Sequence, residues 1–157
     1  MTISAVCLDA EPIALDWIFN RQPPCWDFGP TVGTPSPAFE KRIRDLVGAF
    51  QAALLEADQS GWDGYKAKRA NSGAFMNALS LLFMLPSSTP LPEISVDTDG
   101  DIALEWDRGA RKVFSVRVSR DGTIYYAGLV DYDTFHGSEQ LRESVPSAIS
   151  KGIGRVS

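Results

Sequence analysis

Cysteine and histidine are rare in this chain of 157 residues, which limits the metal sites and the catalytic mechanisms that it can support. The two cysteines, Cys7 and Cys25, match no zinc-ligand spacing, so we expect free thiols. His136 is the only histidine, so any histidine-dependent catalysis must use it. Catalytic signatures, metal-ligand patterns and phosphate-binding loops are also absent. We therefore expect no cofactor and no metal.

Long apolar runs are missing as well. The longest, Leu81–Leu85, is far shorter than the roughly 20 residues that a membrane-spanning helix needs. The N-terminal residues Met1–Ser4 lack the positive flank and cleavage site of a signal peptide. We expect a protein of the cytoplasm with no membrane partner.

Basic charge is the third shortage. Lysine and arginine number 15 against 20 acidic residues, which leaves a net charge of −5. Non-specific nucleic-acid binding needs a basic stripe that displaces counterions, and the nearest approach to one is the short cluster Lys66, Lys68 and Arg69. Direct nucleic-acid binding is therefore disfavoured.

Proline and aromatic residues are concentrated in residues 1–37, which we interpret as an irregular N-terminal arm before a single domain at 38–157. Six prolines in this segment exclude a long helix. Disordered tails rarely carry large aromatics, because such segments lack apolar surface to bury. Trp17, Trp26 and Phe28 are therefore candidate anchors that pack either on the domain's own surface or on a partner.

Two helices are predicted next. The first begins at Ser36-Pro37, a hydroxyl N-cap followed by proline at the first helical position, and should end near Gln59 before the stop at Gly61. Its apolar face is Phe39, Ile43, Leu46, Val47, Phe50, Leu54 and Ala57. The second runs from about Asn71 to Pro86 and is nearly apolar all round, so it should be central.

From Glu93 the apolar period changes to two, which predicts four antiparallel strands in a meander. With three-residue loops at 98–100, 108–110 and 120–122, the apolar strand residues share one continuous face of the sheet. These residues are Ile102, Leu104, Trp106, Phe114, Val116, Val118, Ile124 and Tyr126. We expect this face to pack against Leu79, Leu82 and Phe83 of the second helix. Gly100 and Gly122 should have positive φ. The predicted class is α+β, with two helices on one face of a four-stranded meander.

The opposite sheet face mixes polar and apolar residues and is a candidate docking surface, with Arg117 and Tyr125 as its contact residues. After the last strand, His136-Gly137-Ser138 is predicted to be a loop. Leu141, Val145, Ile149 and Ile153 then recur four apart and predict a short C-terminal helix interrupted by Pro146.

An ordered set of short motifs resembles a widespread family of uncharacterised small bacterial proteins. The set comprises Gly61-Trp62-Asp63-Gly64-Tyr65-Lys66-Ala67, Leu91-Pro92-Glu93-Ile94, Asp99-Gly100-Asp101-Ile102-Ala103-Leu104-Glu105-Trp106 and His136-Gly137. The resemblance covers roughly residues 55–156 and implies no established activity. It implies an accessory protein, sometimes associated with mobile or defence-related gene sets. The chain departs from the family where Lys68-Arg69-Ala70-Asn71 replaces a commonly found proline, and the N-terminal arm lies outside the family pattern.

Two motifs have plain structural interpretations. The turn at Trp62–Tyr65 is first a fold determinant: Trp62 seals the helix pair, Asp63 accepts backbone hydrogen bonds and Gly64 takes a positive φ. Residues Trp62, Tyr65, Lys66 and Arg69 of this turn and the loop after it are also candidate binding residues, since rigidly held loops often carry function. The acids from Asp97 to Glu105 do not fit a calcium loop, because glycine and glutamate fall at the wrong positions.

Two functions of different classes follow from the sequence. The first is a non-catalytic protein-interaction module: an acidic adaptor, inhibitor or antitoxin-like protein that competes for a basic surface on another protein. The second is a small hydrolase or transferase that uses His136 with Asp131 or Asp133. The second needs those side chains to converge in a cleft.

Overall fold

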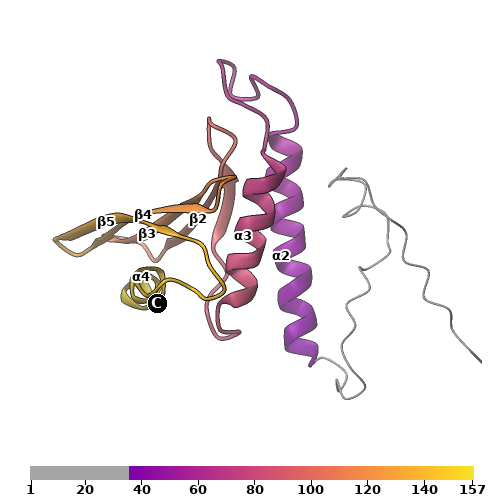
Figure 1. The fold of residues 1–157 in the computed structure, drawn as a ribbon. Coiled ribbons are helices and arrows are strands. Elements are labelled where there is room, and N and C mark those ends of the chain that lie inside the picture. Colours follow the sequence, from indigo (N-terminus) through magenta and orange to yellow (C-terminus); the bar gives the residue numbers. More distant parts are fainter. Residues whose placement is uncertain (1–35) are drawn as a thin grey trace, which may run out of the picture. The chain divides into compact units, whose positions relative to one another are not determined.

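The computed structural model describes residues 36–157, which contain three helices and a five-stranded antiparallel sheet. The α+β class is confirmed. Figure 1 shows α4 on one side of the sheet, α3 next to β2, and α2 on the far side of α3. Residues 38–157 form one compact unit.

Helices α2 (Pro37–Glu56) and α3 (Ser72–Met84) contact each other through Phe50 and Phe75, whose rings meet edge to face at 4.9 Å. Asn71 caps α3 by accepting hydrogen bonds from the backbone N–H groups of Gly73 and Ala74 at 2.9 and 3.3 Å. This accounts for the predicted start of the helix. The apolar face predicted for this helix is only partly buried. Of the predicted residues that lie in α2, Leu46 and Phe50 are the buried ones.

The sheet consists of β1 (Glu93–Val96), β2 (Ile102–Asp107), β3 (Lys112–Val118), β4 (Thr123–Val130) and β5 (Asp133–Gln140), in that order. The prediction of four strands was therefore wrong. His136-Gly137-Ser138 lies within β5 and not in a loop. The alternation of apolar residues is missing from this edge strand, where Phe135 is the one large apolar residue, and Gly137 lies under the ring of Tyr126.

Two of the three predicted hairpin registers are confirmed. Val96 pairs with Ile102, and Val118 pairs with Ile124. The middle register was wrong by two residues, because Leu104 pairs with Val116 and not with Phe114. The backbone N–H of Arg108 donates to the carbonyl of Lys112, so the three-residue loop is 109–111. Arg111, at φ 63°, occupies the third, left-handed position that sequence reasoning reserves for glycine.

The inner face of the sheet forms the core. The predicted strand residues Ile102, Leu104, Trp106, Phe114, Val116, Val118 and Ile124 are all buried, while Tyr126 is half-buried. From α3 the buried leucines are Leu81 and Leu82; the predicted contact Phe83 is instead 48% exposed, and Leu79 is half-buried. The helix is apolar on so many sides that its periodicity does not select the buried face.

Helix α4 (Ser147–Val156) covers the same face as α3 and contacts β2, β3 and β4. It begins just after Pro146, so Leu141 and Val145 lie outside the helix that was predicted to contain them. Proline has no N–H to donate and fits a helix start better than its interior. Gly152 lets α4 approach closely, since a Cβ there would lie 2.3 Å from the Phe114 ring.

Candidate functional site

The outer face of the sheet carries no covering element among residues 36–157. We use "outer face" for the residues that alternate with the core positions: Ala103, Glu105, Ser115, Arg117, Tyr125, Ala127, His136 and Ser138. All eight are half-buried or exposed, and Tyr125 is 43% exposed. Both predicted contact residues of this face, Arg117 and Tyr125, are register partners on adjacent strands.

Arg117 organises one end of the outer face. Its guanidinium lies 4.7 Å from the centre of the Tyr125 ring, within the range of a cation–π interaction. Its nitrogens also lie 3.3, 3.8 and 4.0 Å from carboxylate oxygens of Asp97, Asp99 and Asp101. The arginine is therefore held on one side by the ring and on the other by the β1–β2 turn.

Asp101 is the most buried of the three carboxyl groups around Arg117. Burial raises the pKa of Asp101, and the neighbouring Asp97 carboxylate raises it further, while Arg117 opposes both effects. The Asp97 carboxylate also accepts hydrogen bonds from the backbone N–H groups of Asp99 and Asp101 at 2.8 and 3.0 Å. These bonds fix the turn that the sequence predicted at Gly100, whose φ is 84°.

The loop of residues 61–69 is held by its own polar groups. The Asp63 carboxylate accepts hydrogen bonds from the backbone N–H groups of Tyr65 and Ala67 at 2.8 and 3.2 Å, and Gly64 has φ 82°, as predicted. The Trp62 indole donates to the Lys68 carbonyl at 3.1 Å. Tyr65 is 87% exposed, and Lys66 and Arg69 are exposed beside it.

This loop is joined to the β1–β2 turn, so the two candidate regions are connected. The Lys68 backbone N–H donates to the Thr98 carbonyl at 2.9 Å, and the Asn71 N–H donates to the Gly100 carbonyl at 2.8 Å. The Lys68 ammonium also lies 3.1 Å from Asp99, which in turn faces Arg117. One of the three cations proposed for nucleic-acid contact is thus already paired.

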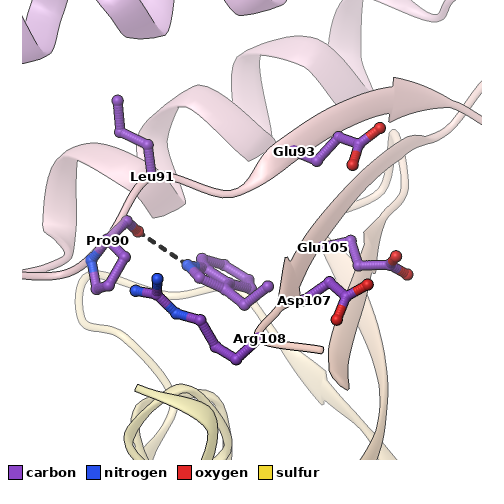
Figure 2. Close-up of a pocket in the computed structure, with 7 residues that line it drawn as sticks. Pro90, Leu91, Glu93, Glu105, Asp107 and Arg108 are labelled. Carbon is purple, nitrogen blue, oxygen red and sulfur yellow. Dashed lines mark hydrogen bonds between the residues drawn. The ribbon is translucent and has the colours of Figure 1, made fainter. Parts of the chain in front are cut away.

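Sequence reasoning missed an acidic patch at the opposite end of β2. Glu93, Glu105 and Asp107 lie beside a hollow of about 140 Å³ that Arg108 and Pro90 also line (Figure 2). Glu93 pairs directly with Glu105 across the strands, and the Ser115 hydroxyl donates to the Glu105 carboxylate. The Trp106 indole, which lines the same hollow, donates to the Pro90 carbonyl at 2.8 Å. The predicted β1–β2 register, taken one step further along the strands, places these two glutamates together.

His136 and the acids proposed to assist it are not brought together. His136 lies on the outer face, whereas Asp133 is an odd-numbered residue of the same strand, faces the other side and ion-pairs with Arg155. Asp131 belongs to the β4–β5 turn. Within residues 36–157 no hydrogen bond or ion pair joins His136 to an acid, so this set of residues supplies no activated nucleophile.

No group of three or more histidine, cysteine, aspartate or glutamate side chains in the described part of the chain is arranged to hold a metal ion. None of the described helices has both the length and the hydropathy to cross a bilayer. The predicted anchors Trp17, Trp26 and Phe28 lie outside the described residues.

Comparison of the chain with protein-family models, with curated proteins and with solved structures gave no match.

Proposed function

We propose that this chain is a non-catalytic protein-interaction module of the cytoplasm that binds a basic surface on another protein through the outer face of its sheet. The proposed role is that of an acidic adaptor, inhibitor or antitoxin-like accessory protein. The observation that carries the proposal is the acidic patch of Glu93, Glu105 and Asp107 on an exposed sheet face.

The acidic patch is costly for the isolated protein. Like charges directly opposite on neighbouring strands destabilise a sheet, and Glu93 faces Glu105 in this way. No lysine or arginine among residues 36–157 forms an ion pair with these three acids. A cationic partner would relieve the repulsion on binding, and its approach would be accelerated by the net charge of −5.

Arg117 and Tyr125 supply the anchors for the same partner. Aromatic and arginine side chains dominate many protein interfaces because they bury large contact areas at low entropic cost. Here both are already positioned, since Tyr125 supports the guanidinium and Asp97 holds it from the turn. Little ordering is therefore needed when a partner docks.

The test compares two variants of equal charge. The full-length tagged chain captures proteins from its host lysate, and the capture is repeated with Glu93→Gln, Glu105→Gln and Asp107→Asn combined. The control combines Glu56→Gln, Asp58→Asn and Glu143→Gln, three exposed acids away from the outer face. We expect a basic protein whose affinity falls at least about tenfold with the first variant, remains unchanged with the control, and weakens as salt is added.

Equal capture of every partner by both variants would contradict the proposal, because a docking site on the acidic patch requires those three carboxylates in particular. If the first variant alone loses the partner, Tyr125→Ala then measures the share that the aromatic anchor contributes.

A further inference from the structure

The two edges of the sheet differ in how well they are protected from pairing with another strand. Strand β1 has four residues, follows Pro90 and Pro92, and begins with the charged Glu93. Strand β5 has eight residues, contains no proline, and is uncharged from Thr134 to Ser138 apart from the titratable His136. Natural proteins protect an edge with short strands, prolines and charges. By these criteria β1 is protected and β5 is open.

The backbone groups that β5 leaves unpaired can be identified. The Leu141 N–H donates to the Gly122 carbonyl, in the same register as the β4–β5 ladder. Hydrogen-bonded pairs alternate along an antiparallel ladder, so Asp133, Phe135, Gly137 and Glu139 bond to β4. Thr134, His136, Ser138 and Gln140 therefore direct their backbone N–H and C=O groups outward, and no other segment of residues 36–157 pairs with them.

We propose that the open edge of β5 binds β5 of a second copy of this chain, antiparallel about a two-fold axis at Gly137. In this register His136 lies opposite Ser138 of the second copy, and Thr134 lies opposite Gln140. Every outward-directed residue of one copy thus meets an outward-directed residue of the other, as an antiparallel hydrogen-bonded ladder requires. The two sheets would join into one sheet of ten strands.

The side chains fit this register. On the outer face His136 lies opposite Ser138 and Thr134 lies opposite Gln140, and on the inner face the Gly137 residues of the two copies meet at the axis. Glu139 of the second copy comes beside Phe135, over whose ring the Arg155 guanidinium lies at 4.5 Å. No like charges stand directly opposite each other, so the strand is complementary to itself. The occupant is therefore a second copy and not a protein of another sequence.

This dimer goes beyond the proposed docking of a basic partner and does not depend on it. The acidic patch lies at β1 and β2, at the other end of the sheet from β5. The two associations also respond oppositely to salt. Two chains of net charge −5 repel each other, so added salt should strengthen the dimer, whereas it should weaken the binding of a basic partner.

The experiment measures the mass of the full-length chain by sedimentation, at concentrations from about 1 to 200 μM, for three proteins: the wild type, His136→Lys with Ser138→Lys, and His136→Glu with Ser138→Glu. Both positions are exposed on the outer face, so the fold should tolerate either change. Each variant alone places two like-charge pairs across the axis and should dissociate about tenfold more readily than the wild type. An equimolar mixture places lysine opposite glutamate and should associate about a hundredfold more tightly than either variant alone.

A control variant, Glu56→Gln with Asp58→Asn, makes the same change of two charge units as the lysine variant at exposed positions outside the sheet and should dimerise like the wild type. A wild type that stays monomeric at every concentration would overturn the proposal. A lysine variant that dimerises as well as the wild type, or a mixture that associates no better than its components, would overturn the pairing about Gly137. Circular dichroism of each variant confirms that the strands are intact.

Discussion

The same strands form both faces of the sheet, but the inner face is buried in the core and the outer face is exposed. On the inner face Phe114 is fully buried, and its ring lies 6.1, 6.2 and 5.8 Å from those of Trp106, Tyr126 and Phe135. On the outer face the Tyr125 ring contacts the Arg117 guanidinium and remains 43% exposed. The inner face holds the register, because a slip by one residue would expose its apolar side chains. Because the inner face fixes the register, the outer face can carry charged residues that do not contribute to folding.

The largest expected difference between the faces comes from truncating one ring on each. Phe114→Ala should lower the free energy of unfolding by about 3–5 kcal/mol, because it leaves a cavity among Trp106, Tyr126, Phe135 and Gly152. Tyr125→Ala should cost less than about 1 kcal/mol, since its ring keeps much of its contact with water. Urea denaturation measures both. Similar losses from the two variants would show that the outer face is as tightly packed as the inner one.

A second comparison concerns the hairpin turns. Gly100 and Gly109 both have positive φ, at 84° and 88°, but a Cβ at Gly100 would lie 2.4 Å from the Arg69 carbonyl oxygen, whereas Gly109 has open space around it. Gly109→Ala should cost about 1 kcal/mol, for its backbone conformation alone. Gly100→Ala should lower the free energy of unfolding by about 2–4 kcal/mol, because the loop of residues 61–69 must also move. Thermal unfolding of both variants checks this, and equal losses would mean that the loop is not tightly joined to the turn.

The smallest effect is a pH dependence that separates two turn carboxylates. Burial raises the pKa of Asp101, so the ionised carboxylate destabilises the folded protein above that raised pKa. This destabilisation is relieved as the pH falls toward the ordinary value of 3.8. Hydrogen bonds from Ser119 and from the Thr123 backbone lower the pKa of Asp121 to about 2. Its stabilising contribution is therefore present above about pH 4 and is lost as the pH falls toward 2.

Asp101→Asn should accordingly flatten the stability profile above pH 4, and Asp121→Asn should flatten it below pH 4. Unfolding midpoints measured from pH 2 to 7 test both. A change on the same side of pH 4 for the two variants would contradict the assignment.

Local sequence rules predicted most of the elements that carry strong signals. Asn71 and Pro37 mark helix starts, and Gly100 and Gly122 mark turns, because a cap or a positive φ is decided by a few neighbouring atoms. Because side chains alternate between the two faces along a strand, Arg117 and Tyr125 lie on the face opposite to their buried neighbours in the chain. The outer face was predictable for this reason.

The missed features depend on contacts between distant segments. Strand β5 lacks an apolar alternation, because Phe135 fills the space above Gly128, and Tyr126 fills the space above Gly137. Contact between a glycine and an aromatic ring on the next strand cannot be predicted until the register of the two strands is known. The middle register failed for a similar reason, since Arg111 adopts φ 63° with its guanidinium 4.3 Å from the Tyr132 ring of another turn.

The sequence by itself determined the α+β class, the starts of α2 and α3, two hairpin registers and the division of the strands into two faces, because these follow from periodicity and from the chemistry of single residues. Only the tertiary structure decided that Phe83 is exposed and Leu81 buried, that β5 forms an edge, that the loop at residues 61–69 joins the β1–β2 turn, and that Glu93, Glu105 and Asp107 lie beside one hollow. Each of these depends on which segments meet in space, and that choice minimises the exposed apolar surface of the whole domain.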